Sequence, residues 1–446
     1  MRRLLGITLL VMALAQLGFR GMQRIRSDIP MWDFVSPLAS TQAWMNGSNP
    51  YDVPSVVTTW RANGIFADRD VSYFATVYPP CSLVMLMPLA LMPAAIAMTT
   101  WLLVILGLLA LQFAALADIA KFRWRDPRLF LLVGASLASG AMQFGILSGQ
   151  LSLPGISVCI IAFWCVCRQR AHLAGILLGL ACALKPQIGA PFFAYFLFTR
   201  HWTVCRFAMI VSLAIFDVAI IGMRVANVDW MTGWSNSIAV TGLPGGVNDY
   251  GWAGTFRDEM MDLKMLLVST PFSPSAVRVL IAAITIAMLA VYVRSFPRGS
   301  RLTHRDELLA LGTLSAISLL PIYHRVYDAV LLTTVLAWIL SELDGPRRRY
   351  ALAMAASMTL FLIPFDLVIS VGYRVPAVAA VAQTWWWQSF IAPHYAWALL
   401  ALTVGSLFAW SRQVASTSAA TEALLTSTGL EPETGRRQLA DAANAS

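Results

Sequence analysis

The stretch AIAMTTWLLVILGLLALQFAALADI, residues 95–119, decides the fold class of this chain. It is apolar almost throughout, and a helix needs about 20 such residues to cross a hydrocarbon core about 30 Å thick. Similar runs recur from end to end, so that the chain is 58% hydrophobic and 12% charged, whereas soluble domains carry about 25% charged residues. We therefore predict an all-α fold, a polytopic bundle of membrane helices.

The basic residues lie in short gaps between the apolar runs. A net charge of +9 could by itself indicate a nucleic-acid partner, but short loops rich in Lys and Arg are typical of the cytoplasmic side of membrane proteins. We predict an integral plasma (inner) membrane protein with the bilayer, not nucleic acid, as its partner. These gaps contain Arg2 and Arg3, residues 121–128, Arg168 and Arg170, Arg200 and Arg206, residues 294–305, residues 347–349, and Arg412.

Placing these gaps inside predicts about twelve crossings and both termini in the cytoplasm. Residues 1–411 form one transmembrane domain with a large first outer loop at 20–78 and a second at 224–262. The segment 79–93 is short and broken by prolines, so we expect a re-entrant or half-helical piece and leave open whether it crosses. Residues 412–446, rich in Ala, Ser and Thr, are expected to form a disordered cytoplasmic tail. The predicted spans lie near 4–19, 95–119, 129–147, 153–167, 173–185, 187–200, 207–223, 276–293, 307–321, 325–341, 351–370 and 395–411.

The six cysteines predict neither a disulfide framework nor a metal site. Most lie within apolar runs, and Cys165 and Cys167 are one residue apart without a second pair. A structural zinc site usually shows two such pairs at characteristic spacings. We interpret the cysteines as packing residues.

Asp33 is the first candidate for chemistry. It stands among Met31, Trp32 and Phe34, and a carboxylate among apolar groups binds its proton more tightly and can serve as a general base. On composition alone, an ordinary loop aspartate that caps a helix near Pro37 is the simpler explanation.

The other polar candidates lie at the predicted outer ends of spans. His324 and Arg325 occur in the run Pro321 to Asp328, where clustered polar groups are costly to desolvate and are therefore usually paired or functional. Lys185 is a lone cation between two short apolar stretches, followed by a proline. All three could bind a phosphate, and snorkelling towards lipid headgroups is the alternative.

Two other classes of function stay open from composition. Asp217 and Asp366 lie within predicted spans, and a proton-coupled transporter or lipid flippase would use such acids. Long outer loops argue against this class, because secondary transporters place their sites between internal repeats near the midplane, and we find no strong repeat. An assembly scaffold without catalysis is the third option, in which the polar outer clusters would be dispensable.

The order of several short motifs resembles glycosyltransferase family 87, polyprenyl-phosphate-mannose-dependent mannosyltransferases of the GT-C superfamily. The resemblance extends over residues 1–411. Its motifs are Asp33 with the later Asn46-Gly47 to Asp52, Tyr78-Pro79-Pro80, Phe144 to Gln150, Ala174-Gly175 to Leu184-Lys185-Pro186, Tyr323-His324 with Tyr327-Asp328, and Trp385 to Trp387.

This resemblance implies a GT-C-like fold whose large first outer loop carries the catalytic carboxylate, at the position of Asp33. It further implies a polyprenyl-phosphate sugar donor, a glycolipid or glycan acceptor and an active site on the outer face. The sugar would be mannose, with arabinose or another pentose as the alternative, and neither a metal nor a cofactor is expected. The donor phosphate would contact His324, Lys185 and Arg325, and the candidate substrate-binding residues are Tyr78, Gln150, Tyr327 and Asp328.

Three positions depart from the family pattern. Pro37 stands where an aromatic residue is frequent, Ser152 replaces a common Asn, and Pro154 follows soon after it. These departures bear on the sugar and the acceptor, and leave the fold expectation unchanged.

Overall fold

The structure is a computed structural model that describes residues 1–26, 31–63, 76–252, 254, 256–296, 302–363, 368, 372 and 374–428. Within these ranges the regular secondary structure is helical, without strands. The predicted all-α class is therefore confirmed.

The longest helices carry the strongest membrane signal. In the described part of the chain, four are long and apolar enough to cross a bilayer, and only 11–22% of their most apolar windows is buried inside the protein. Their remaining apolar surface is available to lipid. Lipid chains form no hydrogen bonds with backbone N–H and C=O groups, so a continuous helix, which pairs these groups internally, is favoured. These helices are α1 (Arg2–Arg26), α5 (Ala94–Ile119), α11 (Trp202–Val225) and α14 (Pro274–Arg294).

Other helices are short or bent. Helices α6 (Pro127–Ala138) and α7 (Gly140–Ser148) are long and apolar enough to cross a bilayer only when taken together as one span, which is bent by 60°. At the bend, Ser139 ends α6 and caps α7 by accepting a hydrogen bond from Met142 N. The segment 79–93 contains α4 (Pro80–Ala90), which at about 1.5 Å per residue is too short to span a bilayer. The count of about twelve crossings stays a prediction.

A central group of short helices supplies much of the buried core between the long peripheral helices. The two helices on either side of Lys185 also carry exposed apolar residues, such as Leu173 and Leu197. The members of this group are α8 (Ser152–Cys167), α9 (Ala171–Leu184), α10 (Pro186–Phe198), α15 (His304–Ser318), the 3₁₀ helix η3 (Val326–Leu332) and α16 (Thr333–Glu342).

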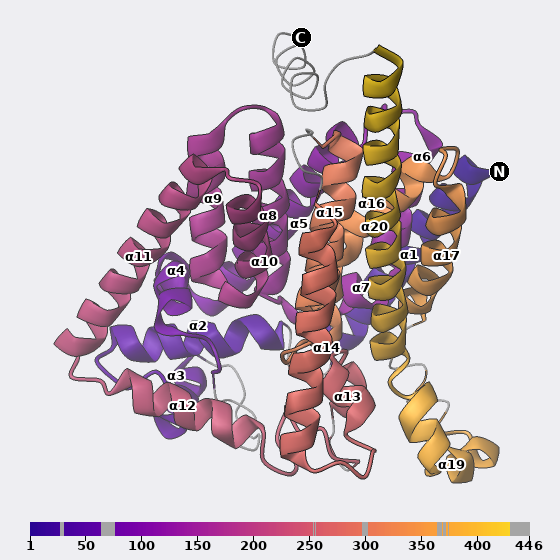
Figure 1. Cartoon of the computed structure of the whole chain (residues 1–446). Coiled ribbons are helices and arrows are strands. Elements are labelled where there is room, and N and C mark those ends of the chain that lie inside the picture. Colours follow the sequence, from indigo (N-terminus) through magenta and orange to yellow (C-terminus); the bar gives the residue numbers. More distant parts are fainter. Residues whose placement is uncertain are drawn as a thin grey trace.

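The described parts of the two predicted outer loops are largely helical and packed. Figure 1 shows α2, α3, α12 and α13 together at the lower end of the bundle, with α2 lying across it. Ten residues of α2 are buried, so this segment forms a base beneath the central helices instead of an open loop. The elements are α2 (Trp32–Met45), α3 (Val53–Ala62), α12 (Trp230–Thr241), the 3₁₀ helix η2 (Arg257–Glu259) and α13 (Leu263–Leu267).

Several of the basic gaps meet at the opposite end of the molecule. Ion pairs join Arg2 to Asp344 at 2.6 Å, Arg168 to Asp118 at 2.7 Å, and Arg347 to Asp306 at 3.1 Å. In Figure 1 the N-terminus and the far end of α20 (His394–Thr428) lie at this upper end. These gaps thus share one end of the bundle, as the charge pattern predicts, and their cytoplasmic side stays a prediction.

The described part of the C-terminal region is helical. Helix α20 continues to Thr428, and alanines such as those near its end are strong helix formers. The disordered tail expected at 412–446 stays a prediction. Residues 429–446 and Asp366 lie outside the described residues. The remaining elements are α17 (Arg348–Thr359), η4 (Leu360–Leu362), α19 (Pro376–Ala382) and η5 (Trp387–Ile391).

Candidate active site

Asp33 lies in the first turn of α2. The chain enters this helix through Met31 in the left-handed conformation, with φ of 54°, and the Asp33 side chain is partly buried. Backbone N–H groups at a helix N-terminus stabilise a negative charge. Asp33 is thus an acid at a helix start, while α2 itself begins earlier than the helix near Pro37 considered above.

A glycine corner holds the start of α2 in place. Helix α7 ends at Gly149, whose φ of +69° few other residues adopt. A Cβ added there would lie 2.8 Å from Met31 Cε and 2.9 Å from Phe34 Cβ. Trp101 Nε1 donates to the Gly149 carbonyl at 2.8 Å and its ring stacks on Phe34. Met31 and Phe34, which flank Asp33 in the sequence, therefore pack directly against Gly149.

Tyr78 and Gln150 meet beside the corner. The Tyr78 hydroxyl donates to Gln150 Oε1 at 2.5 Å. The charges of Asp33, Asp328 and Arg325 all act on Tyr78, and Asp33 also acts on Arg325 and Tyr327. Tyr78 thus lies near both the predicted catalytic carboxylate and the polar run that ends at Asp328.

Lys185 occupies a break between α9 and α10. Pro186 lacks an N–H and disfavours a helical residue before it, so Lys185 is extended, with φ of −152°. The Ser82 hydroxyl, at the start of α4, donates to the freed Leu184 carbonyl at 2.8 Å. This break turns Lys185 inward, where its side chain is 5% exposed.

Lys185 binds Asp328 and Ser152 in the interior. Its Nζ lies 2.9 Å from Asp328 Oδ1 and also donates to Ser152 Oγ. Ser152, at the start of α8, donates to the same Asp328 oxygen at 2.5 Å. The ammonium also lies 5.0 Å above the Tyr327 ring, which stacks on Phe144. Tyr327 is buried, and its ring faces the Lys185 ammonium.

His324 uses the other oxygen of Asp328. Its Nδ1 lies 2.8 Å from Asp328 Oδ2, and the imidazole is fully buried. The second ring nitrogen, Nε2, has no hydrogen-bond partner among the described residues. Asp328 therefore fixes the orientation of both His324 and Lys185 while one nitrogen of the ring is left available.

Such a buried ionic cluster is weak evidence for stability, because desolvation of the charges offsets much of their attraction. An apolar group of similar volume would serve packing as well or better. Buried charges of this kind in a membrane protein are by default a functional hypothesis, and the available His324 nitrogen is consistent with a ligand.

Residues of the second predicted outer loop bind the Arg325 side chain. Its guanidinium lies 3.3 Å from Glu259 Oε2, and it donates to the Val247 carbonyl and to Asn248 Oδ1. The backbone of Met260 pairs with that of Arg325 in a β-bridge. Arg325 therefore ties the second predicted outer loop to the His324 region, and its Nε has no hydrogen-bond partner among the described residues.

An acid of the second predicted outer loop lies near this contact. Asp262 caps α13 and accepts a hydrogen bond from the Tyr250 hydroxyl. Burial raises the pKa of the Asp262 carboxyl to about 6, although the hydrogen bonds from Tyr250 and from Met265 N oppose the shift. The protein therefore carries a titratable group near neutral pH under the candidate site.

The structure brings most of the predicted site residues together, and their roles stay predictions. Asp33, Tyr78, Gln150, Lys185, His324, Arg325, Tyr327 and Asp328 gather in one region, although they come from distant segments. Asp217, by contrast, is exposed on the surface of α11. Sequence reasoning missed Glu259 as the partner of Arg325, and it noted Ser152 only as a departure from a family pattern.

Comparison with known proteins adds one finding. The family model of glycosyltransferase family 87 matches residues 76–322, which is more than half of the chain. The matched range contains Tyr78, Gln150, Ser152 and Lys185, and it ends just before His324. No curated protein matches the chain.

Proposed function

Because the chain belongs to glycosyltransferase family 87, we propose that it transfers a sugar, in our preferred form mannose, from a polyprenyl-phosphate donor. The acceptor is a glycolipid or polysaccharide on the outer face of the membrane, and the anomeric centre is inverted. An arabinosyl or other pentosyl transfer is the alternative. The lipid-linked sugar phosphate is the co-substrate, and no cofactor or metal takes part in the proposed reaction.

One observation carries the proposal. The carboxylate Asp33, in the first turn of α2, lies in the same region as buried Lys185 and His324, since both Asp33 and Asp328, the shared partner of Lys185 and His324, act on Tyr78. Direct displacement at a sugar needs a base on one face and charge stabilisation of the leaving group on the other. In the proposed reaction Asp33 is the base, and Lys185 and His324 stabilise the leaving group.

The chemical step follows from these positions. Asp33 takes the proton of the acceptor hydroxyl, whose oxygen attacks the anomeric carbon. The bond from that carbon to the phosphate oxygen breaks, and the electron pair leaves with the polyprenyl phosphate. Lys185 and His324 stabilise the developing charge, His324 by donating a hydrogen bond through Nε2. One displacement inverts the anomeric centre, and attack from the opposite face requires no covalent sugar–enzyme intermediate.

Asp328 and Ser152 act as positioning residues in this scheme. Asp328 binds both Lys185 and His324, so the orientation of each cation is set before the donor binds. Preorganised charges need no rearrangement during the reaction. The proposal therefore moves Asp328 from direct contact with the substrate to support of the groups that contact it.

The first test replaces Asp33 by Asn. Loss of a general base should reduce turnover about 10²- to 10⁴-fold, with donor affinity and thermal stability in detergent close to those of the unmodified protein. Turnover is measured with radiolabelled polyprenyl-phosphate mannose, and in parallel with the arabinose donor, against a panel of glycolipid acceptors. Substantial activity of Asp33→Asn would overturn its role as base, and a preference for the arabinose donor would favour the pentosyl alternative.

The second test measures donor affinity for His324→Ala and Lys185→Ala. Charge-assisted hydrogen bonds contribute about 1.5–3 kcal/mol each, so each loss should weaken binding about ten- to a hundredfold. Arg224→Ala, exposed at the end of α11, is the control and should change affinity less than about threefold because exposed charges are screened. Equal affinities for all three variants would place the phosphate elsewhere.

A further inference from the structure

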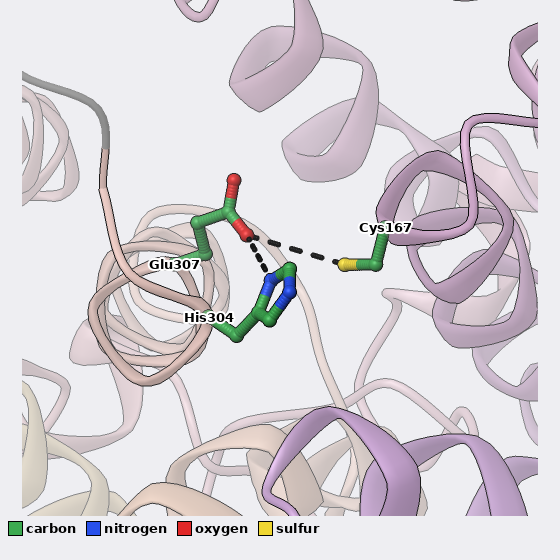
Figure 2. Close-up of side chains that lie close together, drawn as sticks. All are labelled: Cys167, His304 and Glu307. Carbon is green, nitrogen blue, oxygen red and sulfur yellow. Dashed lines mark hydrogen bonds and ion pairs between the residues drawn. The ribbon is translucent and has the colours of Figure 1, made fainter. Parts of the chain in front are cut away.

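Three side chains with metal-binding atoms meet at the end of the bundle opposite to the candidate active site. Cys167 ends α8, whereas His304 and Glu307 lie in the first turn of α15. Figure 2 shows the thiol pointing across to the other two side chains. Glu307 Oε2 lies 3.2 Å from His304 Nδ1 and 4.0 Å from Cys167 Sγ, and the ligand atoms of the three residues lie within 4.8 Å of one another.

No sequence pattern indicates this cluster. We interpreted Cys167 as a packing residue because no second cysteine pair accompanies it, but its neighbours come from another helix, with 140 positions between Cys167 and Glu307. The spacing of His304 and Glu307 by itself indicates only an ordinary ion pair within one helix. The contact between α8 and α15 brings the Cys167 thiol beside this pair. A simple ion pair between His304 and Glu307 does not require a thiol.

The three atom types fit a zinc ion. Zinc bonds to thiolate sulfur at about 2.3 Å and to imidazole nitrogen or carboxylate oxygen at about 2.0–2.2 Å, in tetrahedral geometry. Those bond lengths place neighbouring ligand atoms about 3.3–3.6 Å apart. The observed separations are 3.2 Å, 4.0 Å and, for the remaining pair, within 4.8 Å, so side-chain rotations that bring the Cys167 thiol closer to His304 and Glu307 would complete the geometry. A thiolate together with an imidazole favours zinc over calcium or magnesium, which prefer oxygen ligands.

We propose that Cys167, His304 and Glu307 form a zinc site with three protein ligands and an open fourth position. The His304 side chain is 44% exposed, so water or an external ligand reaches the fourth position from solvent. The site joins the end of α8 to the start of α15, beside the ion pairs of Asp118 with Arg168 and of Asp306 with Arg347. It is independent of the proposed transferase reaction, and it stabilises this end of the bundle by binding the folded state.

The test uses the full-length protein, purified in detergent with an affinity tag free of histidine. Titration with Co²⁺ should give a near-ultraviolet thiolate-to-cobalt charge-transfer band together with visible bands of tetrahedral cobalt, and added Zn²⁺ should abolish both. Equilibrium dialysis should find about one zinc per chain. Zinc should also raise the midpoint of thermal unfolding.

Matched variants decide whether these residues are the ligands. Cys167→Ser should remove the charge-transfer band and weaken zinc binding at least about tenfold, whereas Cys165→Ser, a buried thiol two positions earlier, should bind as the unmodified protein does. His304→Gln, at the most exposed ligand, should weaken binding likewise and keeps the test valid if Cys167→Ser does not fold. Absence of the band in the unmodified protein, or equal zinc affinity in His304→Gln and the unmodified protein, would overturn the proposal.

Discussion

Removal of the Asp328 charge should destabilise the protein through Lys185. The carboxylate accepts hydrogen bonds from Lys185 and Ser152 on one oxygen, and pairs with His324 on the other. In Asp328→Asn the shape is kept, but the Lys185 ammonium, 5% exposed, is left without a counter-charge. Breaking a buried pair by removing one partner costs about 3–5 kcal/mol, of the order of two lost charge-assisted hydrogen bonds at about 1.5–3 kcal/mol each.

The measurement is a double-mutant cycle with Lys185→Met. Unfolding in detergent is followed for both single variants and for the double variant. If the loss in Asp328→Asn comes from the orphaned ammonium, the double variant should recover part of it, with a coupling free energy above about 1.5 kcal/mol.

Two results would refute this reasoning. Asp328→Asn could be as stable as the unmodified protein, which would mean that Lys185 is neutral or hydrated in place. Alternatively, the two effects could add within about 0.5 kcal/mol, which is expected for residues that do not interact. Glu342→Gln, a buried acid whose partner Arg347 lies at the opposite end, is the control and should add independently to Lys185→Met.

Two further predictions follow from single residues. The pKa of Asp262 is raised from 3.8 to about 6 in the folded protein, so the folded state binds this proton more tightly than the unfolded state does. The free energy of unfolding should therefore fall by up to about 3 kcal/mol as the pH rises from about 4 through about 6. Asp262→Asn should remove this fall from the measured pH dependence of unfolding. Gly149→Ala should reduce activity and destabilise the protein by about 2–4 kcal/mol, because the new Cβ is strained at the positive φ and collides with Met31 and Phe34. The control is Gly245→Ala, at a φ of +79° with open space around it. In the same unfolding and turnover assays it should show only the smaller cost of the backbone conformation.

Local sequence patterns are sufficient to predict the class of the protein and several of its local features. Membrane helices follow from hydropathy, which is a property of consecutive residues and needs no tertiary contact. The break at Lys185 follows from Pro186, which removes a donor and restricts the residue before it. The order of short motifs around Asp33, Gln150, Lys185 and His324 was sufficient to indicate family 87, which the match over residues 76–322 confirms.

Which side chains share a site depends on contacts between segments that are distant in the sequence. Lys185 and Asp328 are 143 positions apart, and no local pattern predicts that they pair. The partner of Arg325 is likewise supplied by another segment, at Glu259. The described parts of the outer segments are packed helices because α2 buries its surface against the bundle, and an apolar helix of this length does not reveal from its sequence whether it spans or lies across. Cys167 shows the same limit: its sequence neighbours indicate packing, and only the approach of α15 brings His304 and Glu307 beside its thiol.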